Sequence, residues 1–293
     1  MTIDTGSVKA PRTLAQRILG FLGHGVVHVV LIIVAVIWLV PTVGLLVSSF
    51  RTSTDSAGSG WWTAFLKPAQ LTFENYASLV SDTAALGALG NSLLITLPTT
   101  ILVVVIGSLA GYALSWIEFR GRDWVLIGII VLLAVPLQVA FIPVAGLFRS
   151  LGIFGSVIGV VLFHTAFGLP FAVFLMRNFF GQVPAELLEA SRLDGASEWR
   201  IFTRVVLPLG LPAVASLAIF QFLWTWNDML VALIFSSSQS QPLTVYLQSQ
   251  LRQFGANIDI LSSGAFASML IPLIVFFAFQ RYFESALLAG STK

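Results

Sequence analysis

The chain has 293 residues, of which 57% are hydrophobic and 10% are charged, and its formal net charge is +2. Soluble globular proteins carry about 25% charged residues, so this composition and the mean hydropathy of +0.94 indicate a protein whose solvent is a lipid bilayer. The small net charge gives no indication of nucleic-acid binding, and the lack of cysteine excludes disulfides, thiolate metal sites and cysteine nucleophiles.

The chain opens with a basic tail, residues 1–23, followed by an apolar run that is too long for a signal peptide. Including that run, six apolar stretches are long enough to cross a bilayer, since a span needs roughly 20 residues. The predicted spans are about 26–50, 89–116, 123–148, 153–177, 207–235 and 264–283. Each contains proline, so neighbouring helices must satisfy the freed backbone groups. We therefore expect an all-α integral membrane protein of about six transmembrane helices.

The predicted membrane domain covers residues 24–288, with a short C-terminal tail at 289–293. Its longer loops are an outer loop at 51–86, an inner loop at 178–206 and a second outer loop at 236–263. With the N-terminus inside, the inner segments carry eleven of the fifteen lysines and arginines, and the outer segments carry four. Cytoplasmic loops of membrane proteins carry this excess, so both termini and the inner loop are expected in the cytoplasm.

A charged segment, residues 186–208, lies between the fourth and fifth predicted spans and holds four acids and three arginines. Pro184 suits the first position of a helix, and Glu186 then complements the positive end of the helix dipole. Gly195 readily takes the left-handed conformation that ends a helix, and Ser197 can cap a second helix after it. The segment is therefore predicted to be a helix–turn–helix on the membrane surface.

The charged segment also carries a spaced motif. It reads Glu189-Ala190-Ser191, three residues, Gly195, nine residues, then Val205-Val206-Leu207-Pro208. This resembles the Glu-Ala-Ala…Gly…Ile-x-Leu-Pro loop of ABC-importer permease subunits, with Ser191 and Val205 as the departures. In that family the loop is the coupling helix that binds in a cleft of the ATP-binding subunit. The resemblance implies an ABC type I importer permease fold and assigns ATPase docking to Glu186, Glu189, Ala190, Ser191, Asp194, Gly195, Ala196, Arg200, Leu207 and Pro208.

Other motifs are similar to those of maltose-type carbohydrate permeases, and most closely to the α-glucoside branch. They are Trp226-Asn227-Asp228, Pro242-Leu243-Thr244-Val245, Gln280-Arg281-Tyr282-Phe283 and Leu288-Ala289-Gly290. The resemblance implies a bacterial or archaeal cytoplasmic membrane and three kinds of partner: a second permease subunit, two copies of an ATP-binding subunit and an extracytoplasmic sugar-binding protein. It also implies that Arg252, Gln253, Phe254 and Asn257 face the binding protein. The alternative for their loop is an interfacial cap over the bundle.

The chain has no phosphate-binding loop of its own. Its three lysines are Lys9, Lys67 and Lys293, and none follows a glycine as that motif requires. We therefore expect a transport subunit that is not an enzyme and binds no cofactor or metal, with ATP and Mg²⁺ held by the partner ATPase.

Several polar side chains fall inside predicted spans. Asp228 is placed near the centre of the fifth span, where a carboxylate costs about 2.5–3.5 kcal/mol and should face the bundle interior or water. The candidates for a substrate path are Asn91, Gln138, Gln221, Trp224, Asn227 and Asp228. Aromatic faces beside hydrogen-bonding groups suit sugars, but hydrogen bonds that fix helix packing are an equal alternative. His164, with no acid at helical spacing, is expected to be a packing residue.

Two other classes of protein fit the sequence less well. An ion-coupled secondary transporter predicts internal repeats and several intramembrane charges, and the sequence offers no clear repeat and one such acid. An integral membrane enzyme predicts an acid–base pair or a metal-ligand cluster at one depth, which the sequence does not suggest. For an ABC permease, the expected substrate is an α-glucoside or other oligosaccharide. The alternative substrate is a non-sugar solute such as glycerol phosphate or a polyol.

Overall fold

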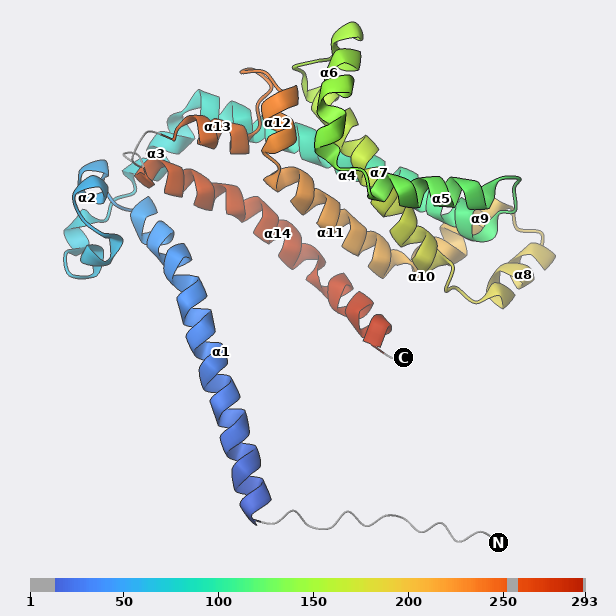
Figure 1. Ribbon diagram of the computed structural model, residues 1–293, viewed down its shortest axis with the longest axis horizontal. Helices are drawn as coiled ribbons and strands as arrows, with labels where there is room; N and C mark the ends of the chain where they lie inside the picture. Colours follow the sequence, from blue (N-terminus) through green and yellow to red (C-terminus); the bar gives the residue numbers. More distant parts are fainter. Residues whose placement is uncertain (1–13, 252–257, 292–293) are drawn as a thin grey trace.

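The computed structural model describes residues 14–251 and 258–291, and these form helices joined by short turns, without a named strand (Figure 1). The elements are α1 Leu14–Ser49, α2 Ser53–Gly58, η1 Trp61–Phe65, η2 Pro68–Gln70, α3 Glu74–Ser81, α4 Thr83–Trp116, α5 Arg122–Leu133, η3 Leu137–Ala140, α6 Phe141–Ser150, α7 Val157–Phe180, α8 Ala185–Leu193, α9 Glu198–Ile201, η4 Phe202–Val206, α10 Leu207–Leu209, α11 Leu211–Asn227, α12 Leu230–Phe235, α13 Leu243–Ser249 and α14 Ile258–Ser291. The all-α prediction is confirmed.

Four helices of the described chain are long and apolar enough to cross a membrane without interruption: Gly25–Ser49, Thr83–Trp116, Val157–Phe180 and Ile258–Gln280. Two further candidates are bent pairs, α5 with η3 and α6 at 96°, and α9 to α10 with α11 at 77°. Six spans result only when each bent pair counts as one. The third and fifth predicted spans are therefore each a bent pair of helices.

Proline and glycine explain the two bends. Pro136 is extended, with φ −63° and ψ 129°, and the residue before a proline is disfavoured in a helix. Pro143 instead sits in the first turn of α6, where its missing N–H leaves no helical bond unmade. At the second bend, Gly210 lies under the Phe180 ring, and a Cβ atom there would lie 2.4 Å from that ring. Only glycine fits without displacing it.

The centre of the bundle is the pair α4 and α7, joined at close range by glycines. A Cβ atom on Gly107 would lie 2.7 Å from the Cβ of Ala172, and one on Gly111 would lie 2.5 Å from that of Met176. Small residues let membrane helices approach in this way. α11 packs on both helices, α14 packs on α11, and α1 diverges from the bundle at its N-terminal end (Figure 1).

The segment after α1 folds around one buried side chain, that of Arg51, which is 1% exposed. Its guanidinium donates to the carbonyls of Asp55 and Ser59 at 2.8 and 3.0 Å and to the Gln70 side-chain oxygen at 3.1 Å. Asn75 Nδ2 donates back to the Arg51 carbonyl at 2.8 Å. The predicted polar loop at 51–86 is thus a compact helical unit.

A short helix, α13, packs against the N-terminal end of α4. Tyr246 on α13 donates a hydrogen bond to the carboxylate of Asp82, which also caps α4 by accepting from the backbone N–H of Ala84 at 2.8 Å. The Tyr246 bond lowers the pKa of Asp82 against the opposing effect of burial. Burial, and then the bond to Asp82, raise the pKa of Tyr246 to about 12. This hydrogen bond between Tyr246 of α13 and the Asp82 carboxylate at the start of α4 is called the latch, and the latch depends on the ionised carboxylate.

We expect this latch to weaken in acid. The folded-state pKa of Asp82 lies below its ordinary value of 3.8, so its contribution to stability is present above that value and is lost as pH falls through the folded-state pKa. The protection of α13 against hydrogen exchange, relative to the intrinsic amide exchange rate at each pH, should be constant near neutral pH and fall below about pH 4. Tyr246→Phe should abolish the acid-dependent step. An identical acid profile in the variant would contradict the assignment.

Candidate functional site

The charged segment forms a hairpin of α8 and α9, residues 185–201, as predicted. Gly195 has φ +76° and ends α8, and its N–H donates to the carbonyl of Arg192 at 3.0 Å. Pro184 occupies the N-cap and not the first helical position. Ser197 occupies the N-cap of α9, although its side chain makes no capping bond. The second helix begins at Glu198, directly after this cap, and passes into the π-helical η4.

One face of the hairpin packs against the bundle and the other is open. Leu188 is fully buried in a cluster with Phe180, Ile201 and other apolar residues. In contrast, Leu193 is 89% exposed and Trp199 is 65% exposed. Large apolar side chains exposed on a charged hairpin are typical of a surface that binds a partner.

A set of hydrogen bonds ties the hairpin to α4. Within the hairpin, Arg192 Nε pairs with Glu198 Oε1 at 2.9 Å, and this bond lowers the pKa of the Glu198 carboxylate. Tyr112 Oη on α4 donates to the other Glu198 oxygen at 2.5 Å. Arg192 Nη2 donates to the carbonyl of Trp116, the last residue of α4, at 3.2 Å. The hairpin is therefore anchored to α4 by polar bonds as well as by apolar packing.

The residues assigned to ATPase docking divide into two groups. Those on the hairpin gather around an open hollow of about 320 Å³, which Ser191, Asp194, Ala196 and Arg200 line together with Ile201, Arg204 and Val205. Glu186, Glu189, Ala190 and Gly195 lie exposed beside it. Leu207 and Pro208 instead form α10 at the 77° bend. The motif therefore spans a surface and the joint that connects it to α11.

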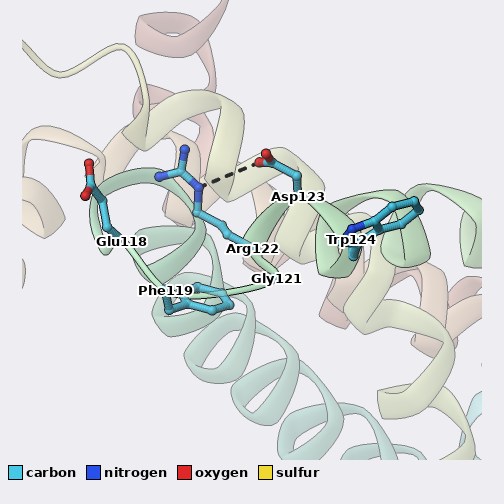
Figure 2. Close-up of a pocket in the computed structure, with 6 residues that line it drawn as sticks. All are labelled: Glu118, Phe119, Gly121, Arg122, Asp123 and Trp124. Carbon is cyan, nitrogen blue, oxygen red and sulfur yellow. Dashed lines mark ion pairs between the residues drawn. The ribbon is translucent and has the colours of Figure 1, made fainter.

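A second open cavity, of about 400 Å³, lies at the turn between α4 and α5 (Figure 2). Glu118, Phe119, Gly121, Arg122, Asp123 and Trp124 line it. Its one arginine, Arg122, faces the Asp123 carboxylate at 3.9 Å. No group of three metal-ligating side chains occurs among the described residues, there or elsewhere. The cavity offers no single charge that would select a ligand, and no sequence motif pointed to it.

Asp228 lies at a joint between two helices. α11 ends at Asn227, and the Asp228 carboxylate caps α12 by accepting from the N–H groups of Val231 and Ala232 at 3.1 and 3.2 Å. The same oxygen lies 3.4 Å from Nε2 of His164 on α7. Asp228 lies within the predicted fifth span, and the structure adds that the helix breaks at this acid and uses it as a cap. The acid partner of His164 comes from another helix, which spacing along α7 cannot reveal.

Two substrate-path candidates meet in an apolar pocket between α7 and α11. Phe171, Phe220, Gln221 and Trp224 line this pocket, which has a volume of about 220 Å³. Gln221 is buried and its Nε2 donates to Thr225 Oγ1 at 3.0 Å, whereas Trp224 is partly exposed. The pocket thus combines three aromatic side chains with one amide.

The other predicted polar residues lie elsewhere. Asn91 Nδ2 donates to the carbonyls of Gln239 and Gln241 at 2.9 and 3.1 Å and so holds the loop before α13. Asn227 donates to its own helix, and Gln138 is exposed on η3 at the bend. The four residues predicted to face a binding protein, Arg252, Gln253, Phe254 and Asn257, lie outside the described residues.

Comparison with known proteins gives concordant matches. The family model described as "Binding-protein-dependent transport system inner membrane component" matches residues 103–288. The osmoprotective compounds uptake permease protein GgtD of Synechocystis sp. is 42% identical over 272 residues, covering 91% of each chain. The alpha-glucoside transport system permease protein AglG of Rhizobium meliloti is 44% identical over 233 residues, covering 77% of this chain and 61% of the relative.

The fold also matches a solved structure. A chain in the crystal structure of a bacterial ABC transporter involved in the import of the acidic polysaccharide alginate superposes with a TM-score of 0.77 at 23% identity. The match covers 94% of this chain and all of the other.

We expect Asp228→Leu to destabilise the protein by roughly 2–4 kcal/mol, because it removes the cap of α12 and the carboxylate that faces the buried His164 ring. Asp228→Asn keeps an oxygen at the cap and should cost less. The exposed Asn227→Leu is the matched control and should change little. Thermal unfolding in detergent would measure the relative stability of the three variants. An Asp228→Leu variant as stable as the natural protein would refute the capping role.

Proposed function

Because this chain belongs to the family of binding-protein-dependent transport system inner membrane components, we propose that its α8–α9 hairpin is the docking site for a separate ATP-hydrolysing subunit. The chain is a permease subunit of an ATP-binding-cassette importer for sugars or oligosaccharides, and it is not an enzyme. Family membership leaves no support for the ion-coupled transporter or the membrane enzyme considered from the sequence.

The observation that carries the docking proposal is the two-faced hairpin. Leu188 fixes one face to the bundle, while Leu193 and Trp199 present apolar surface outward beside the hollow of about 320 Å³. Glu186 and Glu189 are exposed on α8, and the lining of the hollow carries Asp194 together with Arg200 and Arg204. Since the chain lacks a phosphate-binding loop, its energy has to come from a partner that binds ATP and Mg²⁺.

We propose that the hairpin and both termini face the cytoplasm, as the eleven-to-four distribution of lysine and arginine supports. The proposed assembly contains a second, non-identical permease subunit, two copies of the ATP-binding subunit and an extracytoplasmic sugar-binding protein. The family description supports dependence on a binding protein. The copy numbers and the heterodimer rest on the resemblance of the motifs.

The proposed load is an α-glucoside or a closely related small oligosaccharide. The alpha-glucoside permease at 44% identity supports this choice. So does the pocket of Phe171, Phe220, Gln221 and Trp224, because sugars offer apolar faces to aromatic rings and hydroxyls to an amide. Asp228 and His164 would then hold the joint beside the pathway without contacting the sugar.

We expect Glu189→Lys and Gly195→Asp each to reduce co-purification of the ATP-binding subunit at least about tenfold, the effect of 1.4 kcal/mol. The first reverses a charge on the exposed face of α8, and the second places a side chain on a turn with φ +76°. Pull-down of the tagged permease from membranes, quantified against membrane-inserted permease, measures the effect.

The control for docking is Glu74→Lys, the same charge reversal at an exposed position of α3. It should leave co-purification unchanged. Unchanged association in both hairpin variants, with normal membrane insertion, would refute the docking site.

For the substrate, Trp224→Ala should lower uptake of an α-linked disaccharide roughly five- to tenfold by removing one aromatic face. Trp124→Ala, at the cavity of Figure 2, is the matched control and should not change uptake. Uptake by the assembled complex, tested with a panel of α-linked oligosaccharides, polyols and glycerol phosphates, is the measurement. Activity on the polyols or phosphates alone would overturn the sugar assignment.

A further inference from the structure

We propose that Tyr112 is a positioning residue of the transport cycle, which transmits the movement of the α8–α9 hairpin to α4 through Glu198 and Arg192. The inference rests on the proposed docking function. It adds to it the route by which a displacement of the docked hairpin reaches the membrane helices.

The geometry places Tyr112 between two environments. Its ring is buried, at 4% exposure, and packs against Phe202 with ring centroids 5.2 Å apart. Its hydroxyl reaches out of this apolar cluster and donates to Glu198 Oε2 at 2.5 Å. Glu198 is held on its other oxygen by Arg192. The tyrosine therefore connects a rigid core position on α4 to the ion pair that joins α8 and α9.

The bonds at this point differ in kind from the rest of the contact between hairpin and bundle. Leu188, Ile201 and Val206 make apolar contacts, which are non-directional and so do not fix one relative position of the two surfaces. The bonds of Tyr112 and Arg192 are directional and charge-assisted. They are suited to transmit a pull, so that α4 follows the hairpin when it moves away from the membrane.

The pull would reach α7 as well, because the ends of α4 and α7 are joined. Trp116 Nε1 donates to the Phe180 carbonyl at 2.8 Å, and Ser115 Oγ donates to the Arg177 carbonyl at 2.9 Å. α7 carries Phe171 of the apolar pocket. A second, covalent route runs through η4 and α10 to α11, which carries the other pocket residues. The two routes together would move both walls of the pocket.

The test is Tyr112→Phe in the complete complex reconstituted in liposomes, with sugar uptake and ATP hydrolysis measured on the same preparation. We expect normal retention of the ATP-binding subunit, hydrolysis within about twofold of the natural complex, and uptake reduced about tenfold, the loss of one charge-assisted bond. The sugar transported per ATP hydrolysed should fall accordingly. Tyr76→Phe is the matched control, since the Tyr76 hydroxyl on α3 bonds to Ser49, the last residue of α1, at 2.8 Å.

A second variant distinguishes two causes of reduced uptake in Tyr112→Phe: loss of the transmitted movement, and a Glu198 carboxylate left without its hydrogen bond. Tyr112→Phe combined with Glu198→Gln removes the stranded charge and keeps an amide oxygen that can accept from Arg192. If the defect arises only from an unsatisfied Glu198, the double variant should restore uptake, and the proposal is overturned. If Tyr112 transmits the stroke, the double variant stays uncoupled.

Three further results would also overturn the proposal. They are an unchanged ratio of uptake to hydrolysis in Tyr112→Phe, a parallel loss of both activities, and loss of the ATP-binding subunit from the complex. Failure of the docking function itself would look different, because the natural chain would then not retain an ATP-binding subunit at all.

Discussion

Backbone polar groups inside a bilayer have no water to bond with, and this constraint governs where the helices of this chain can break. At the α11–α12 joint, the Asp228 carboxylate accepts from two backbone N–H groups of the new helix. At the α5–α6 bend, Pro136 contributes no N–H that would need a partner. At the bend of Gly210, the N–H of this glycine donates to the carbonyl of Val206 at 2.8 Å. At each break, the backbone N–H groups that the helix loses as partners are therefore either bonded in another way or absent.

These joints surround a rigid pair of helices. Gly107 and Gly111 bring α4 and α7 into backbone-level contact, and the bonds from Ser115 and Trp116 lock their ends together. The bent elements α5–α6 and α9–α12 pack around this pair (Figure 1). An arrangement of one stiff pair between jointed neighbours is suited to rocking motions of an importer, since packed helices move as units about a few hinge positions.

Local rules in the sequence were sufficient where one residue decides the outcome. Gly195 ends α8 because a left-handed position favours glycine, and the hairpin was therefore predictable. The breaks at Pro136 and Asp228 were not, because proline and acid are both tolerated inside spans when neighbours compensate. Contacts between residues distant in sequence could not be predicted. Tyr112 and Glu198 are 86 residues apart, and no periodicity links them. The hairpin was accordingly predictable, but its attachment to α4 was not.

The buried guanidinium of Arg51 has one more consequence. Its partners are carbonyl, hydroxyl and amide oxygens, and it pairs with no carboxylate among the described residues. Arginine keeps its proton at any physiological pH, and neutral dipoles in a buried site are little affected by dissolved ions. The unit formed by α2, η1 and η2 should therefore keep its shape across wide changes in acidity and ionic strength. Such tolerance would suit the extracytoplasmic side, where the proposed topology places this unit.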